Sequence, residues 1–227
     1  MTTRLLEQFD RIVVFDTETT GIDFAHDEII ELGAVCLTAE GETAAIDDLI
    51  RLSPGRTLPP FITDLTSITA EQLKAEGVEK PRAAEDFCRL LEGAERPLLA
   101  AYNAQFDLSF LYYFLRPLGR AGALVPPRFL DLLTVYRDRR DYPHRLSDAI
   151  AAFGLTDAVN SHRAVDDARA ALALLGAMEA ERADLDQYID LFGTHPKYGL
   201  SGKPISSVTY RTQSYQRQRP LYETGGV

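Results

Sequence analysis

The chain has 227 residues, 45% hydrophobic and 26% charged, which excludes a largely disordered protein and, at roughly 100–200 residues per domain, allows one large domain with an appendage. Its formal net charge of −10 argues at first sight against a nucleic-acid partner. Because Cys36 and Cys88 are the only cysteines and no run approaches the ~20 apolar residues of a membrane helix, we expect no disulfide scaffold and a soluble protein of the reducing cytoplasm.

Apolar runs and turn signals predict an α/β domain over residues 1–192. Strands are predicted at residues 11–16, 28–38, 43–52 and 97–101, with a short fifth strand at Leu130. Helical spacing predicts helices over residues 62–65, 70–76, 82–91, 105–118, 131–138, 147–153 and 162–182. The mixture of strands and helices is typical of one layered α/β unit.

Helical periodicity stops at Gly193, so we predict a C-terminal arm over residues 193–227 with a strand at 205–211. The arm has five cations (Lys197, Lys203, Arg211, Arg217 and Arg219) and one acid (Glu223), a balance of +4 that leaves −14 for residues 1–192. Its tyrosines (Tyr198, Tyr210, Tyr215 and Tyr222) are interleaved with the cations. This mixture indicates an arm that helps to hold a nucleic acid, or else one that packs across the domain.

Acidic residues occur where a core is expected. Asp16 and Glu18 lie two apart at the end of the first strand, so strand alternation puts both carboxylates on one face, where they repel unless the strand end is solvated. Asp107 shares a helical stripe with Leu111, Phe114 and Leu118. A charge on such a packed face needs a partner or a metal, unless it is an exposed first-turn acid.

A third acidic position follows Ser161, the predicted N-cap of the last long helix. Asp166 is in line with Arg163 and Arg169, which indicates an ion-paired solvent face. Asp167 is in line with apolar residues (Ala171, Leu174 and Met178), so we expect Asp167 to point inward. His162 can share its site from the loop before the helix.

Four inward carboxylates without matching Lys or Arg suit the oxygen preference of Mg²⁺ or Mn²⁺. Two such ions ~3.5–4 Å apart stabilise the attacking and leaving oxygens of phosphoryl transfer. The residues alone therefore indicate phosphodiester hydrolysis.

These residues resemble the three motifs of the DEDDh 3′→5′ exonucleases, the DnaQ-like superfamily. The match covers residues 11 to about 180. The first motif is Phe-Asp-Thr-Glu-Thr-Thr-Gly at residues 15–21, the second is Tyr-Asn-Ala-Gln-Phe-Asp at 102–107, and the third is His-Arg-Ala-Val-Asp-Asp at 162–167. The spacing of the third motif again selects Asp167. Residues 65–69, Leu-Thr-Ser-Ile-Thr, resemble a family segment that lies against the terminal nucleotide.

The resemblance implies a ribonuclease-H-like fold with a mixed five-stranded sheet. It implies that Asp16, Glu18, Asp107 and Asp167 bind two Mg²⁺ or Mn²⁺ ions, and that His162 is the general base toward water, which suits an imidazole at neutral pH. It also implies contacts to the terminal nucleotide from Thr19, Ile22, Ile68, Asn103 and Phe106, although core packing is the alternative for Ile22, Ile68 and Phe106. Two residues depart from the family pattern: Tyr102 replaces the usual His, and Ser67 replaces the usual Gly.

The resemblance implies a metal-dependent 3′→5′ exonuclease that releases nucleoside 5′-monophosphates from single-stranded or frayed DNA, in proofreading or repair. The alternatives are an exoribonuclease that trims RNA 3′ ends and a non-catalytic module of a replication complex. A polymerase is a further expected partner. Residues 187–192 loosely resemble peptides that dock on a sliding clamp, with the spacing off by one, but the favoured explanation is the end of a helix that packs Ile189 and Phe192 on the core.

Overall fold

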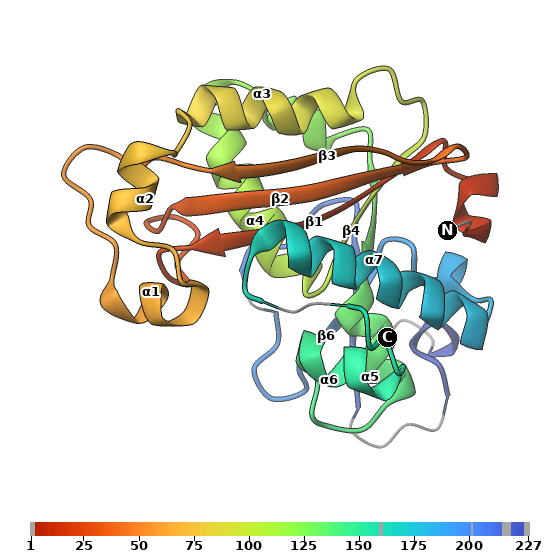
Figure 1. Ribbon diagram of the computed structural model, residues 1–227. Coiled ribbons are helices and arrows are strands. Elements are labelled where there is room, and N and C mark those ends of the chain that lie inside the picture. The colour runs from red at the N-terminus through yellow and green to blue at the C-terminus, as the bar shows by residue number, and fades with distance from the viewer. Residues whose placement is uncertain (1–2, 159–160, 201, 215–218, 225–227) are drawn as a thin grey trace.

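A mixed five-stranded sheet forms the centre of the computed structural model, which describes residues 3–158, 161–200, 202–214 and 219–224 (Figure 1). Its strands are β1 (Arg11–Thr19), β2 (Ile29–Thr38), β3 (Gly41–Leu49), β4 (Pro97–Ala101) and β5 (Arg128–Asp131), in the order β3-β2-β1-β4-β5. β1 is antiparallel to β2 and parallel to β4, and β2 and β3 form the predicted hairpin. The predicted mixed sheet is confirmed.

Helices cover both faces of this sheet (Figure 1). The α-helices are α1 (Pro60–Thr66), α2 (Ala70–Ala75), α3 (Lys80–Leu91), α4 (Ala104–Leu115), α5 (Leu132–Arg139), α6 (Leu146–Ala152) and α7 (Ala164–Glu181). Short 3₁₀ turns occur at Arg4–Glu7, Arg116–Leu118, Ala121–Leu124, Leu185–Tyr188 and Leu221–Glu223. None of the helices in the described part of the chain is long and apolar enough to cross a membrane.

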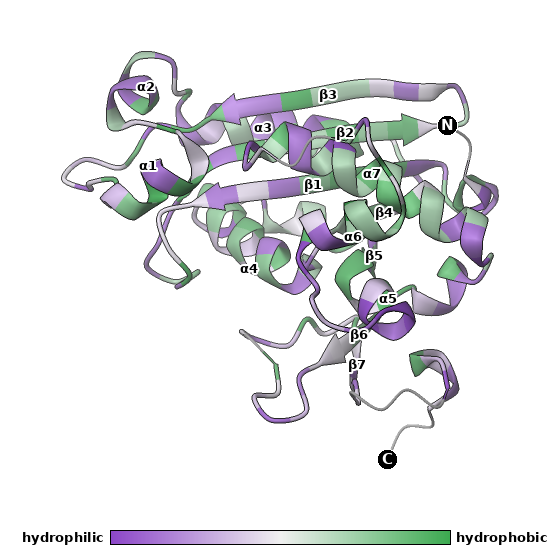
Figure 2. Cartoon of the chain, turned by 60° about the horizontal axis from the view of Figure 1, so that its bottom comes forward, coloured by the Kyte–Doolittle hydropathy of each residue, from purple (hydrophilic) through white to green (hydrophobic). Residues whose placement is uncertain are grey.

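Alternation along β1 divides the core into two layers. Ile12 and Val14 pack in the cluster that contains the buried residues of α5 and α7, whereas Val13 and Phe15 pack in the cluster that contains those of α3 and α4. Toward its C-terminal end β1 changes from hydrophobic to hydrophilic residues, as Figure 2 shows. The polar end of a central strand therefore lies between two helical layers.

The arm packs on the domain through both core layers. β6 (Leu191–Thr194) and β7 (Thr209–Thr212) form a parallel pair, Val208 joins one layer and Leu221 joins the other. The hydroxyl of Tyr210 donates to Gln105 Oε1 at 2.6 Å, and that of Tyr222 donates to Asp184 Oδ2 at 2.9 Å. These two tyrosines thus hold the arm on the domain and are not free to stack on nucleobases. Tyr215 and Arg217 lie outside the described residues.

Several predicted boundaries shift because tertiary contacts extend or shorten the elements. β1 continues to Thr19 because its polar end still pairs with β2, and α7 begins at Ala164 with Arg163, not Ser161, at the N-cap position. The division of the chain at residue 192 falls inside β6 and stays a prediction.

The segment compared with clamp-binding peptides is part of the core. Leu191 and Phe192 are buried, as is Tyr188, and the segment is a 3₁₀ turn followed by β6 rather than a helix end. A clamp cannot reach these side chains in the folded chain, so the docking hypothesis is wrong for this segment.

Candidate active site

Two carboxylates of the site come from the polar end of β1. Asp16 and Glu18 are half-buried, and they share the parity of Ile12 and Val14, so the strand directs them toward the layer of α7. Burial raises the pKa of Glu18 to about 8, and the charges of Asp167, Glu31 and Asp107 add to the effect. Burial also raises the pKa of Asp16 well above its usual range, again with help from neighbouring carboxylates. The carboxylates of Asp16 and Glu18 therefore lie close enough to other acidic groups for their negative charges to repel one another.

Asp107 reaches the same end of β1 from the first turn of α4. It is buried, and its Oδ1 accepts hydrogen bonds from the backbone N–H of Thr17 at 3.1 Å and from the Thr17 hydroxyl at 2.7 Å. Burial raises the pKa of Asp107 to about 7, although the two Thr17 hydrogen bonds act in the opposite direction. Thr17 thus fixes a carboxylate that lies on the stripe predicted to be inward-facing.

A buried acid that the sequence reasoning missed, Asp131, holds the turn before α4. Its Oδ1 accepts from the backbone N–H groups of Asn103 and Ala104 at 3.1 and 3.0 Å, while its Oδ2 caps α5 at Thr134. Asn103 is exposed and left-handed, with φ 73°. Asn tolerates this region better than most residues, which explains an Asn at the start of the second motif.

α7 lies directly against β2 because a glycine leaves room for it. A Cβ on Gly33 would lie 2.1 Å from the backbone nitrogen of Val165, and Gly33 pairs with Asp16 across the β1–β2 register. No residue with a side chain could permit this approach. A glycine inside an otherwise apolar strand was the sequence signal for it.

Glu31 joins β2 to the start of α7. It is fully buried, and it accepts from Arg163 Nε at 2.7 Å and from the backbone N–H of Ala164 at 2.8 Å, while Arg163 Nη2 lies 2.6 Å from Glu31 Oε1. The prediction that Arg163 and Arg169 pair with Asp166 is wrong. Arg163 turns inward to Glu31 because that carboxylate is buried, and Arg169 pairs with Glu42.

Asp167 and His162 meet Glu18 at this junction. One ligand atom of each of Glu18, His162 and Asp167 lies within 4.8 Å of the others. Asp167 is buried on α7 as predicted, whereas Asp166 is partly exposed and accepts from the Ser161 hydroxyl at 2.8 Å. His162 is exposed and left-handed, with φ 54°, in the segment before the helix.

The donor set fits a hard divalent cation. The four motif carboxylates converge from β1, α4 and α7, and burial together with neighbouring carboxylates raises the pKa values of Asp16, Glu18 and Asp107. Carboxylate oxygens are the ligands that Mg²⁺ and Mn²⁺ prefer. The identity of the metal stays a prediction.

The residues predicted to contact a terminal nucleotide differ in exposure. Ile22 is 85% exposed just beyond β1, whereas Ile68 is 2% exposed and packs with Ile30 and Ile62, as its core-packing alternative requires. Phe106 is half-buried with its ring 4.9 Å from that of Phe110. Thr19 is buried and its hydroxyl donates to the carbonyl of Gly21 at 2.5 Å. Figures 1 and 2 both place α1, with the exposed Phe61 and Leu65, beside this end of β1.

The two departures from the family pattern have structural explanations. Ser67 is the C-cap of α1 and is left-handed, with φ 61°, a conformation that glycine adopts without strain. Tyr102 is half-buried, and its hydroxyl donates to the carbonyls of His144 and Arg145 at 3.0 and 3.1 Å. Tyr102 therefore ties the loop between α5 and α6 to the second motif.

Comparisons of the chain with known proteins point to one family. The model of a family described as an exonuclease family, RNase_T, matches residues 13–175. The chain is 36% identical to the DNA polymerase III subunit epsilon of Treponema pallidum over 177 residues, 74% of this chain and 76% of the relative. It is 35% identical over 219 residues to the PolC-type DNA polymerase III of Caldanaerobacter subterraneus, 93% of this chain but 15% of the relative.

Among solved structures, E. coli exonuclease I in complex with a dT13 oligonucleotide is similar, with a TM-score of 0.70 and 19% identity over 79% of this chain and 43% of that one. At this identity the likeness concerns the fold. It confirms the expected ribonuclease-H-like arrangement of a mixed five-stranded sheet flanked by helices.

Proposed function

Since the chain belongs to the RNase_T exonuclease family, we propose that it is a divalent-metal-dependent 3′→5′ exonuclease that releases nucleoside 5′-monophosphates from single-stranded or frayed DNA ends. The observation that carries this proposal is the convergence of Glu18, His162 and Asp167 within 4.8 Å, beside Asp16 and Asp107. The polymerase names of its relatives support proofreading or repair, in contact with a polymerase. A cytoplasmic location stays a prediction.

The four carboxylates have one task, to hold the metal. Two Mg²⁺ or Mn²⁺ ions on Asp16, Glu18, Asp107 and Asp167 would stabilise the charge that develops on the attacking and leaving oxygens. Thr17 and Glu31 keep the donors on α4 and α7 at the end of β1. The rest of the site then serves the water and the 3′ end.

His162 is the group that takes the proton from the attacking water. Its ring lies beside Glu18 and Asp167, and it is exposed, so water can reach it. The exposed Ile22 and Asn103, with the half-buried Phe106, border the place for the terminal nucleotide. Ile68 supports this wall from the core, and Thr19 holds the turn that carries Ile22.

The test uses 5′-labelled DNA and RNA oligonucleotides of one sequence, incubated with Mg²⁺ or with EDTA. We expect a ladder that shortens from the 3′ end of DNA, with nucleoside 5′-monophosphates as products, and no ladder in EDTA. Asp167→Asn should abolish the ladder, while Asp166→Asn, its neighbour on α7, should leave it largely intact. No hydrolysis with Mg²⁺ or Mn²⁺ would overturn the proposal, and faster hydrolysis of RNA would move the substrate to the exoribonuclease alternative.

The substitution His162→Ala distinguishes a role of His162 as general base from a role as metal ligand. We expect kcat to fall by roughly 10²–10⁴-fold with Mn²⁺ binding retained, the usual range for loss of a general base. Loss of Mn²⁺ binding, measured by calorimetry, would instead make His162 a metal ligand.

A further inference from the structure

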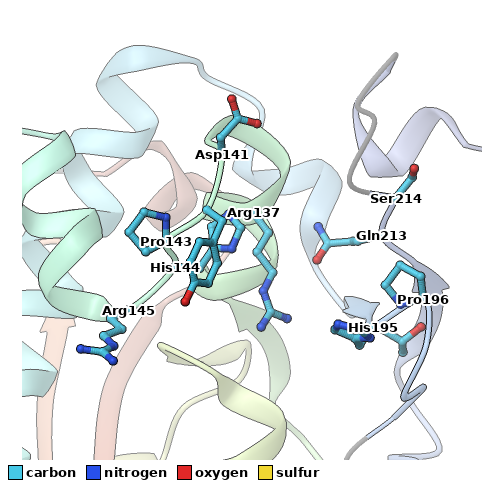
Figure 3. Close-up of a pocket in the computed structure, with 11 residues that line it drawn as sticks. Arg137, Asp141, Pro143, His144, Arg145, His195, Pro196, Gln213 and Ser214 are labelled. Carbon is cyan, nitrogen blue, oxygen red and sulfur yellow. The ribbon is translucent and has the colours of Figure 1, made fainter.

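A cavity of about 380 Å³ lies between the segment that follows α5 and the strand segment of the arm (Figure 3). One wall carries Arg137, His144 and Arg145, and the other carries His195 and Gln213. Figure 3 shows these two groups of side chains on opposite sides of an open space. None of the residues assigned to the carboxylate site lines this cavity.

The cavity is basic in a strongly acidic protein. Neither Arg137 nor Arg145 forms an ion pair with a carboxylate that the structure describes, and Asp141, which is exposed, is the acidic side chain among the described lining residues. Arginines nearby are instead paired: Arg139 and Arg182 with Asp184, and Arg140 with Glu181. Two guanidinium groups that form no ion pair with a described carboxylate are suited to a phosphate group, although the charge of Arg137 also acts on the buried Asp131. The two imidazoles border the cavity but already have partners: His144 Nε2 donates to the carbonyl of Arg140, and His195 Nδ1 accepts from the backbone N–H groups of Lys197 and Tyr198.

The cavity is joined to the carboxylate site by Tyr102. Its hydroxyl holds the carbonyls of His144 and Arg145, and its ring packs on Tyr136, which in turn contacts the His144 ring. The next residue is Asn103, at the start of the helix that carries Asp107. The backbone that places Asp107 therefore also positions one wall of the cavity.

We propose that this cavity binds a backbone phosphodiester of the substrate strand, on the 5′ side of the nucleotide that is cleaved. The proposal rests on the proposed exonuclease function, because that function supplies the polyanionic strand that extends away from the 3′ end. An arginine site that Tyr102 connects to the second motif would orient this strand and offset its charge.

The experiment compares two substrates that differ in the upstream strand. One is a single-stranded oligothymidylate of about 12 nucleotides, within the usual site sizes for such strands. The other is the p-nitrophenyl ester of thymidine 5′-monophosphate, which occupies the cleavage site but has no upstream phosphodiester. The variants are Arg145→Gln, whose exposed side chain can change without repacking, and the double variant with Arg137→Gln. Arg89→Gln is the matched control, since it removes one positive charge on α3, in the opposite layer.

We expect KM for the oligonucleotide to rise about 10-fold in the double variant, with kcat/KM for the ester unchanged and no effect of Arg89→Gln. Oligonucleotide affinity in Ca²⁺ should also become less dependent on salt, by about 0.7 in the logarithmic slope per lost phosphate contact. Thermal melts check that each variant folds.

An unchanged KM and salt slope would overturn the cavity proposal and leave the exonuclease function standing. Equal losses on both substrates would also overturn it, because the arginines would then act on the cleavage site. If the wild type hydrolyses neither substrate, the exonuclease function fails, and the binding measurement in Ca²⁺ still decides whether the cavity holds a strand.

Discussion

Replacing Glu31 by Gln tests how the fold positions Asp167 and His162, the proposed catalytic groups at the start of α7. Glu31 is 0% exposed, and its carboxylate holds both the Arg163 guanidinium and the first N–H of α7. Breaking a buried ion pair costs about 3–5 kcal/mol when the remaining charge is buried. Because the Arg163 side chain is 37% exposed, solvent screens the orphaned charge, and we expect about 2–3 kcal/mol of lost unfolding free energy.

This loss should appear in a thermal melt as a decrease of roughly 4–12 °C, at about 2–4 °C per kcal/mol for a chain of this size. The same substitution should lower kcat about 10²-fold, because a displacement of about 1 Å at the start of α7 moves His162 and Asp167 away from Glu18. The assay is hydrolysis of the labelled DNA oligonucleotide with Mg²⁺.

The direction in which Glu31→Gln changes the activity distinguishes a positioning role of Glu31 from a purely electrostatic one. Besides burial, the charge of Glu31 raises the pKa of both Asp16 and Glu18, so its removal alone would favour their ionised, metal-binding forms. A purely electrostatic role therefore predicts higher activity at about pH 6, whereas the positioning role predicts lower activity at every pH.

Glu42→Gln is the matched control. Glu42 also joins a strand of the sheet to an arginine of α7, but the Glu42–Arg169 pair is 42% and 49% exposed, and such surface pairs contribute about 0–1 kcal/mol. If Glu31→Gln and Glu42→Gln have equally small effects on melting and on turnover, the argument from burial is refuted.

Three further predictions address backbone conformation, close packing and metal binding. Ser67→Gly should raise the melting temperature, since the left-handed Ser67 costs about 1 kcal/mol relative to glycine, and a lower value would contradict this origin of the strain. Gly33→Ala should reduce activity at least as strongly as Glu31→Gln, because its Cβ would displace the start of α7, and normal turnover would show that this contact does not position the site. The pKa of Glu18 is raised to about 8, so between about pH 4.5 and pH 8 this carboxyl ionises more readily in the unfolded chain than in the folded one, and the metal-free protein loses stability as the pH rises. Mn²⁺ binds the ionised carboxylate and should therefore raise the melting temperature more at pH 8 than at pH 5.5. An increase in melting temperature that does not depend on pH would refute this linkage.

The carboxylates of the site were predictable because each is a charged side chain at a position where the local pattern predicts a buried apolar one. Asp16 and Glu18 extend the alternation of β1, and Asp167, unlike Asp166, continues an apolar helical stripe. The strands of the sheet were predictable for the same reason, since buried strands are short apolar runs between turn signals.

The residues that hold the site together were less accessible to such reasoning. Glu31 and Gly33 act on residues more than 130 positions away, so nothing in their own neighbourhood names Arg163 or Val165 as the partner. The sequence showed only an acid and a glycine inside an apolar strand, each of which has several local explanations. The arm was ambiguous for a similar reason, because tyrosines that stack on bases and tyrosines that pack on a core have the same composition.

An acidic chain can process a polyanion because charge acts locally. Residues 1–192 carry −14, but part of this excess is gathered at the carboxylate cluster, where divalent cations would offset it in the proposed function. Arginines such as Arg128 and Arg163 are already paired with buried acids and contribute little attraction toward a strand. The guanidinium groups without such partners then decide where a strand can lie, and net charge alone is a poor guide to whether this chain binds a nucleic acid.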